Sequence, residues 1–249
     1  MEHTCLNCNR QLIENYCQNC GQKSTTHRYS LKHFIEHDII HGVWHVDKGI
    51  LFTIKELFTR PGHSVREFVQ GKRINLFNFI SLIVLLLATS SFLGHYTHVK
   101  MTDLMPESSK AMMSPVEKFA TEYPKLVLVI TIPIYSLFSF IWFRKTKLNF
   151  TEHLVLNSYK TSGELVIGLL FTALAIFNTN IKTLIIVYYF FVVFSSLIYS
   201  IWFYYQFFSK YEYSKRSLFF RAIMVPVSYM LISMITGFVM ALLAKLRHG

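Results

Sequence analysis

The chain has 249 residues, of which 52% are hydrophobic and only 16% are charged, and its formal net charge is +11 at pH 7. Its mean hydropathy is +0.35, and long stretches after residue 74 contain no Lys, Arg, Asp or Glu. This composition argues against a water-soluble globular domain and predicts a mainly α-helical membrane protein. Basic residues are frequent in the first 75 residues, where we expect them to face an anionic membrane surface.

All four cysteines of the chain lie near its start, as Cys5, Cys8, Cys17 and Cys20 in a C-x2-C-x8-C-x2-C pattern. Paired C-x2-C motifs are typical of zinc ribbons, in which four thiolates surround one Zn²⁺ at about 2.3 Å. Two disulfides in a secreted domain are the alternative, but the segment is hydrophilic and no secretory signal precedes it. We therefore predict a zinc ribbon over residues 1–24. Four protein ligands leave the metal no open position, so its role is structural.

Residues 25–75 carry apolar patterns that are helical but short. One row with a spacing of four begins at Leu31, a second apolar group covers residues 50–58, and a third follows Pro61 and Gly62. None approaches the roughly 20 residues that are needed to cross a bilayer. We expect this region to form cytosolic amphipathic helices beside the membrane.

Four histidines in this region form a candidate second metal site. His33, His37, His41 and His45 recur at intervals of four residues. On an α-helix this spacing places them on one slowly drifting face, where neighbouring imidazoles can share a transition metal. A pH-sensitive surface and an ordinary solvated helix face are the alternatives.

Long apolar segments predict a transmembrane helical domain over residues 76–249. The expected spans are about 76–96, 126–143, 154–177, 183–208 and 222–244. The third reaches adequate length only if its helix begins near His153, and the aromatic fourth suits an interface belt. Basic residues after the second and fourth spans place the N-terminus in the cytoplasm. A bundle of about five spans leaves the C-terminus outside, whereas four spans, with the third segment re-entrant or on the surface, return it to the cytoplasm.

The densest basic stretch leads directly into the first span. Arg60, Arg66, Lys72 and Arg73 are interrupted by glycines, which allow backbone amides to approach an anion. These four residues form a candidate site for anionic lipid headgroups or phosphate. Simple anchoring at the membrane surface is the alternative.

The start of the third span combines ionisable and polar residues. Counted on a helix, His153, Asn157, Lys160 and Glu164 fall near one face. Ionisable groups at membrane depth are costly and normally face a bundle interior or a watery cavity. They form a candidate intramembrane polar cluster, with an amphipathic entry helix at the interface as the alternative.

Three separated motifs resemble a known family. They are C-L-N-C with Y-C-Q-N-C-G-Q in the ribbon, D-K-G-I-L-F-T-I-K-E-L-F-T-R-P-G-H-S-V-R-E-F-V-Q-G-K-R at residues 47–73, and F-T-E-H-L-V at residues 150–155. In this order they resemble the bacterial membrane-protein family catalogued as domain of unknown function 3667. The resemblance implies an integral membrane protein with a cytosolic ribbon, and it implies no activity.

We therefore expect a multi-pass protein of the bacterial inner membrane that is not an enzyme, because no nucleophile–base pair is recognisable. Its ribbon and basic helices would act as a scaffold that recruits a cytosolic or membrane protein partner or anionic membrane lipids. The alternative is a transporter, channel or lipid-handling protein that uses the polar cluster, and an enzyme acting at the bilayer is a third class. A homo-oligomer fits each of these, while nucleic acid is left open by the ribbon and the basic charge but is not the expected partner.

Overall fold

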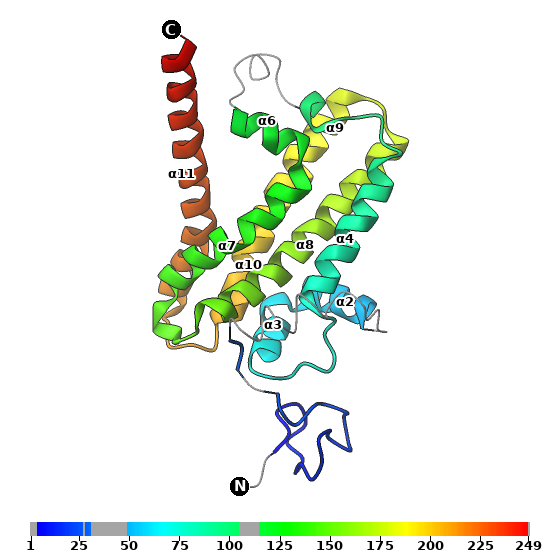
Figure 1. Cartoon of the computed structure of the whole chain (residues 1–249), viewed down its shortest axis with the longest axis vertical. Helices are drawn as coiled ribbons and strands as arrows, with labels where there is room; N and C mark the ends of the chain where they lie inside the picture. Colours follow the sequence, from blue (N-terminus) through cyan, green and yellow to red (C-terminus); the bar gives the residue numbers. More distant parts are fainter. Residues whose placement is uncertain (1–3, 27, 31–48, 105–114, 249) are drawn as a thin grey trace.

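The computed structural model describes residues 4–26, 28–30, 49–104 and 115–248. The described part of the chain is almost entirely helical outside its N-terminal module, which contains two isolated antiparallel bridges, Thr4 with Gln11 and Tyr16 with Lys23. This module, which we call the ribbon, lies at one end of a long helical bundle (Figure 1). The end of the bundle that carries the ribbon is called the base below.

In the part of the chain that the structure describes, five helical rods run between the base and the far end, and successive rods alternate in direction (Figure 1). They are α4 (Phe79–Gly94), α7 (Pro124–Trp142), α8 (Phe150–Phe177), the continuous rod of α9 (Ile181–Val187), π-helix η5 (Tyr188–Val193) and α10 (Phe194–Phe208), and α11 (Lys215–His248). The last four rods are long and apolar enough to cross a membrane. The fold is thus that of a multi-pass membrane protein.

The first rod, α4, is too short to cross a bilayer as a straight helix. α4 has 16 residues, or roughly 24 Å of helix against a hydrocarbon core of about 30 Å. The hydropathy pattern suggests instead that the third span is the short one, but its helix, α8, has 28 residues. It begins at Phe150 because Asn149 and Glu152 form a capping box: the Glu152 N–H donates to the Asn149 side chain, and the Asn149 N–H donates to the Glu152 carboxylate.

The last rod also starts earlier than the hydropathy predicts. α11 begins at Lys215 rather than near residue 222, and Pro226 lies inside the helix without ending it. Its first turns are held to the end of α7, where Arg221 donates to the backbone carbonyl of Trp142. The Trp142 indole N–H in turn donates to Ser228 Oγ at 2.9 Å.

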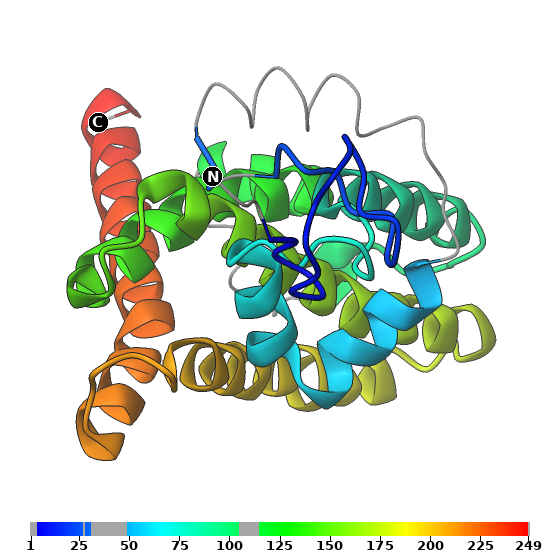
Figure 2. The same cartoon turned by 90° about the horizontal axis from the view of Figure 1, so that it is seen from below.

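Two short helices, α2 (Ile50–Thr59) and α3 (Pro61–Val69), lie across the base of the bundle (Figure 2). Both contact α8, and α3 also packs on α10. Pro61 occupies the first turn of α3, where its missing N–H removes no helical hydrogen bond. These helices match the two amphipathic segments that were expected after residue 49, and they are partly buried against the bundle.

The remaining described elements are brief. η3 (Met101–Leu104) and α6 (Pro115–Glu122) lie at the far end, and η4 (Arg144–Thr146) joins α7 to α8 at the base. Lys147 follows η4 with a φ of 56°.

The contact between α3 and α10 requires a residue without a side chain at position 62. A Cβ atom on Gly62 would lie 2.2 Å from the Phe207 nitrogen and 2.4 Å from the Phe203 oxygen. We expect Gly62→Ala to separate the two helices and lower the free energy of unfolding by about 1–3 kcal/mol, as overpacked sites do. Thermal unfolding of the purified protein in detergent measures the effect.

Gly168→Ala is the matched control for that substitution. Nothing lies within 4 Å of a Cβ atom at Gly168 in α8, and Ala favours a helix over Gly by roughly 1 kcal/mol. This variant should therefore be neutral or slightly stabilised. Equal melting temperatures for the two variants would contradict the close approach of α3 to α10.

Candidate functional site

The four cysteine sulfurs of the ribbon converge on one point. All four Sγ atoms lie within 4.8 Å of one another, with Cys5 and Cys20 at 3.6 Å and Cys8 and Cys17 at 3.5 Å. Four thiolates around one Zn²⁺ at about 2.3 Å would stand roughly 3.8 Å apart, so the donor set fits a tetrahedral ion. The four cysteines could therefore hold a metal ion, as their spacing predicts.

The two cysteine pairs share the same backbone geometry. The Asn9 N–H donates to the Cys5 carbonyl, and the Gly21 N–H donates in the same way to the Cys17 carbonyl. Asn9 and Gly21 both have positive φ, 59° and 74° respectively, which Gly and Asn tolerate best. Each pair thus forms one turn that directs two sulfurs to the same side.

The surroundings of the thiols differ between the pairs. The backbone N–H of Arg10 lowers the pKa of the Cys8 thiol to about 6, whereas burial raises the pKa of Cys5 to about 11. Thiolates are the form that binds metals. A metal ion would hold all four cysteines deprotonated, so binding at neutral pH should release the proton of Cys5.

Gln22, one residue after the second cysteine turn, joins the ribbon to the bundle. Its side-chain amide donates to the Gly71 carbonyl at 2.9 Å and accepts from the Arg73 N–H at 3.1 Å. Gly71 has a φ of 112°, and a Cβ atom there would lie 2.7 Å from Leu6 of the ribbon. Gln22 is 4% exposed, so this two-bond contact is sealed from water.

A second connection runs from residues 28–30 to the start of α8. The Arg28 guanidinium donates to both Glu152 oxygens, at 2.5 and 2.7 Å, and to the Lys147 carbonyl. Its contact with Glu152 raises the pKa of Arg28. The Tyr29 carbonyl accepts from the Asn149 side chain, and the Tyr29 ring lies 3.8 Å below the Arg73 guanidinium. The capping box of α8 is thus part of the ribbon attachment.

The basic stretch near α3 is engaged with protein groups. Arg66 is buried and donates to the carbonyls of Gln206 and Phe207 at the end of α10, at 2.8 and 3.0 Å. Cations are favourable at a helix C-terminus. His63 Nδ1 lies 3.0 Å from Arg66 Nη2 and can only accept there. Burial, with the charges of Arg66 and Arg60, lowers the pKa of His63 accordingly.

The other three basic residues are less buried than Arg66. Arg60 pairs with Glu56 at 2.6 Å and with Glu67 at 3.3 Å, and Lys72 lies 3.9 Å from Glu67. The Arg60 and Lys72 side chains are 46% and 50% exposed, while Arg73 stacks on Tyr29. Headgroup binding stays a prediction, and Arg60 and Lys72 are the residues best placed for it.

The predicted polar cluster of α8 is brought together, and most of it is buried. His153 and Asn157 are fully buried and share Ser139 of α7, whose Oγ lies 2.8 Å from His153 Nδ1 and 3.0 Å from Asn157 Nδ2. The Tyr204 hydroxyl of α10 donates to Asn157 Oδ1 at 2.6 Å. These bonds join three rods through side chains, as buried polar groups in a bilayer require.

One turn further along α8, Lys160 and Glu164 form an ion pair. Lys160 is fully buried, and its Nζ lies 3.0 Å from Glu164 Oε1 and 3.5 Å from the centre of the Tyr135 ring of α7. The Glu164 side chain is 15% exposed. Tyr135 itself stacks on Tyr229 of α11, with ring centres 4.6 Å apart. The pair therefore lies inside the bundle rather than on a wet helix face.

Several partners in these sites were not expected from the sequence. Tyr199 and Tyr204 suited an interface belt, but both are buried and face α8. Gln22 and Arg28 act through contacts with residues 49 to 124 positions away, which no local pattern encodes. The predicted histidine site at His33, His37, His41 and His45 lies outside the described residues.

These observations define a multi-pass membrane protein with a four-cysteine module fixed to its base. The model of a protein family described as "Protein of unknown function (DUF3667)" matches residues 47–90, which confirms the resemblance to that family. The match covers α2, α3 with Gly62, the segment with Gly71 that follows α3, and most of α4. No curated protein and no solved structure matches the chain.

The metal centre can be tested through its ligands. We expect about one metal ion per chain in purified protein, because four converging thiolates bind one tetrahedral ion. Cys17→Ser should lose the ion and leave the ribbon open to protease, since a segment of this size has little core of its own. Elemental analysis and limited proteolysis measure both effects. Gln18→Ala changes an exposed neighbour and should alter neither.

The Gln22 contact can be tested at a single amide. Gln22→Leu removes both hydrogen bonds, so the Arg73 N–H loses its acceptor. Hydrogen exchange at Arg73 should accelerate by roughly tenfold, which corresponds to about 1.4 kcal/mol of lost protection. Gln18→Leu, at an exposed position of the ribbon, is the control. Unchanged exchange at Arg73 in Gln22→Leu would show that the ribbon is held in another way.

Proposed function

We propose that the protein is a membrane scaffold whose ribbon, folded around zinc, presents a docking surface to a cytosolic protein partner. The observation that carries the proposal is the division of the ribbon into two faces. One face is fixed to the bundle through Gln22 and through Leu6 against Gly71. The other face exposes apolar side chains that have no role in this attachment.

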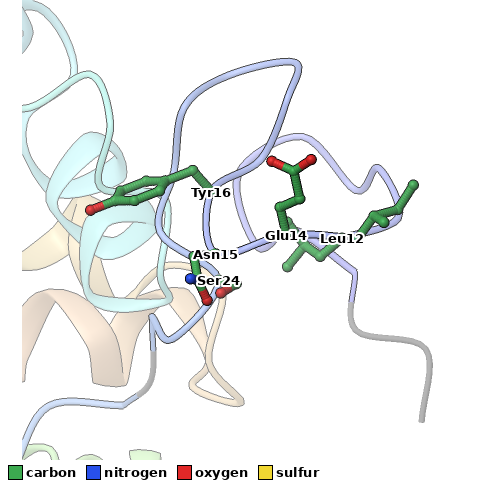
Figure 3. Close-up of a pocket in the computed structure, with 6 residues that line it drawn as sticks. Leu12, Glu14, Asn15, Tyr16 and Ser24 are labelled. Atoms are coloured by element: carbon green, nitrogen blue, oxygen red, sulfur yellow. The ribbon is translucent and has the colours of Figure 1, made fainter.

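The exposed face is the loop between the two cysteine pairs. An open hollow of about 630 Å³ is lined by Leu12, Ile13, Glu14, Asn15, Tyr16 and Ser24 (Figure 3). Ile13 is 81% exposed and Tyr16 is 58% exposed. Exposed apolar side chains that are grouped together mark interaction sites more often than isolated ones do, and Tyr is enriched in protein interfaces.

Zinc is the metal that best suits this donor set. Four cysteine sulfurs in tetrahedral arrangement are typical of structural Zn²⁺, and such a site holds its segment folded without supplying catalysis. The metal would therefore fix the shape of the loop between the pairs. We assign it no chemical step.

The distribution of charge supports a cytoplasmic ribbon and an inner-membrane location. The two described connections between rods at the base are basic: Arg144, Lys145 and Lys147 precede α8, and Lys210 precedes α11, which itself begins with Lys215 and Arg216. Connecting segments rich in Lys and Arg are retained in the cytoplasm. Arg60 and Lys72 at the same end can add attraction to anionic lipids, each worth about 1 kcal/mol near the surface.

Photocrosslinking in cells tests the docking surface. A photoreactive amino acid at Ile13 or Tyr16 should give a discrete crosslinked product, and one at Gln18, which is exposed on the second cysteine turn, should not. Ile13→Asp should abolish the product formed from position 16 while leaving the metal content unchanged. Equal products from positions 13 and 18, or none from either hollow position, would refute the proposal.

A further inference from the structure

A hollow of about 400 Å³ lies between the ribbon and the base of the bundle. Its lining combines ribbon residues with residues of the connections at the base, among them Leu6, Arg28, Val69, Lys147, Leu148 and Tyr211. Sites for small molecules have volumes of roughly 300–1,000 Å³ and combine apolar walls with a few polar groups. The hollow has this size and this mixture of side chains.

The charges that line the hollow leave an excess of one cation. Glu152 is the acidic residue of the lining, and its side chain is 3% exposed. Both of its oxygens accept hydrogen bonds from Arg28, and one also accepts from the Asn149 N–H. Lys147 is exposed and has no ion-pair partner among the described residues. The ligand that suits this balance is an anion.

Three groups in the lining can donate hydrogen bonds to such an anion. Arg28 uses its Nε and Nη2 for Glu152 and the Lys147 carbonyl, while its Nη1 has no hydrogen-bond partner in the part of the chain that the structure describes. The Lys147 ammonium carries three further donors. Tyr211 contributes a hydroxyl, and burial raises the pKa of Tyr211, so this group keeps its proton.

The arrangement of these donors favours a phosphate over a carboxylate. The fork of Arg28 already binds a carboxylate, that of Glu152. The remaining donors come from three segments that are far apart in the sequence but line one hollow. A phosphate can accept from several directions at once, and Arg and Lys are its usual partners. Apolar side chains in the same lining, such as Leu6 and Leu148, can contact an organic group attached to it.

The backbone at Lys147 supports a role for its side chain. Lys147 has a φ of 56°, a left-handed conformation that Gly and Asn adopt more easily than Lys does. Local folding alone would therefore favour another residue at this position. Residues in such conformations are frequent at ligand-binding sites.

We propose that this hollow binds a phosphate ester through Arg28, Lys147 and Tyr211, and that the phosphate belongs to a membrane lipid headgroup or to a water-soluble ester. The site differs from the basic stretch near α3, because none of the four residues of that stretch lines the hollow. It also lies apart from the loop between the cysteine pairs, so it does not depend on the proposed docking surface. A ligand there would contact both the linker that follows the ribbon and the base of the bundle.

The full-length protein in an uncharged detergent tests the proposal. Its melting temperature is measured in sodium chloride, sodium phosphate and sodium glycerol 3-phosphate at equal ionic strength, and in vesicles of phosphatidylcholine with and without phosphatidylglycerol. A phosphate that binds the folded protein should raise the melting temperature further as its concentration grows. Stabilisation by the free phosphates identifies a water-soluble ester, and stabilisation by phosphatidylglycerol alone identifies a lipid headgroup.

Substitutions at Lys147 separate this site from general attraction to basic protein. Lys147→Asn and Lys147→Gly remove the ammonium, and both new residues tolerate the positive φ, so the variants should fold as well as the native protein does in chloride. Each should bind the phosphate roughly tenfold more weakly, because one charged hydrogen-bond donor is lost. Lys145→Asn removes the same charge from an exposed neighbour in η4, outside the hollow, and should bind as the native protein does.

Three results would overturn the proposal. The hollow is not a phosphate site if neither the free phosphates nor phosphatidylglycerol changes the melting temperature of the native protein. Equal stabilisation of the native protein and the Lys147 variants would show that the anion acts on the basic surface as a whole. A greater loss of binding in Lys145→Asn than in Lys147→Asn would place the anion at η4 instead.

Discussion

The polar side chains of α8 must find their hydrogen-bond partners within the protein, because the core of a bilayer provides no such partners. This requirement determines which side chains the neighbouring helices place against α8. α7 supplies Ser139 and Tyr135, and α10 supplies Tyr204. α4, which has no ionisable residue, packs on the same helix, and Tyr159 of α8 donates to the Phe77 carbonyl just before α4 begins. Of the four rods long enough to cross a membrane, α8 is therefore both the most buried and the least apolar, and its neighbours are positioned to form hydrogen bonds with it.

Arginine side chains cap the two rods whose C-terminal ends lie at the base. Arg66 donates to the last carbonyls of α10, and Arg221 donates to Trp142 at the end of α7. Both rods end with carbonyls that lie beyond the regular helical hydrogen bonds and with a negative dipole end, which a guanidinium satisfies well. Basic residues at the base thus fasten the ends of the helices, and α3 is the element that carries one of them to α10.

Much of the architecture followed from local patterns. Hydropathy located every long rod, the cysteine spacing anticipated the convergence of the four sulfurs, and helical counting placed His153, Asn157, Lys160 and Glu164 near one face. Start sites were less accurate where a cap or a charge overrode hydropathy, as at Asn149 and Lys215. Gln22 with Gly71 and Arg28 with Glu152 depend on folding distant segments together, so no periodicity could reveal them. Tyr199 and Tyr204 were misassigned because an aromatic row fits a lipid interface and a polar core equally well.

The π-helix η5 has a consequence for how the fourth rod meets the core. A π-turn accommodates one extra residue, and one residue corresponds to about 100° of rotation in an α-helix. Everything after Val193 is therefore turned relative to a regular continuation of α9. The phenylalanines of η5, including Phe190 at 76% exposure, face outward, while Tyr199 and Tyr204 face α8. The extra residue changes the helical register, so that one continuous rod presents exposed apolar side chains at η5 and a hydrogen-bonding side chain to α8 in α10.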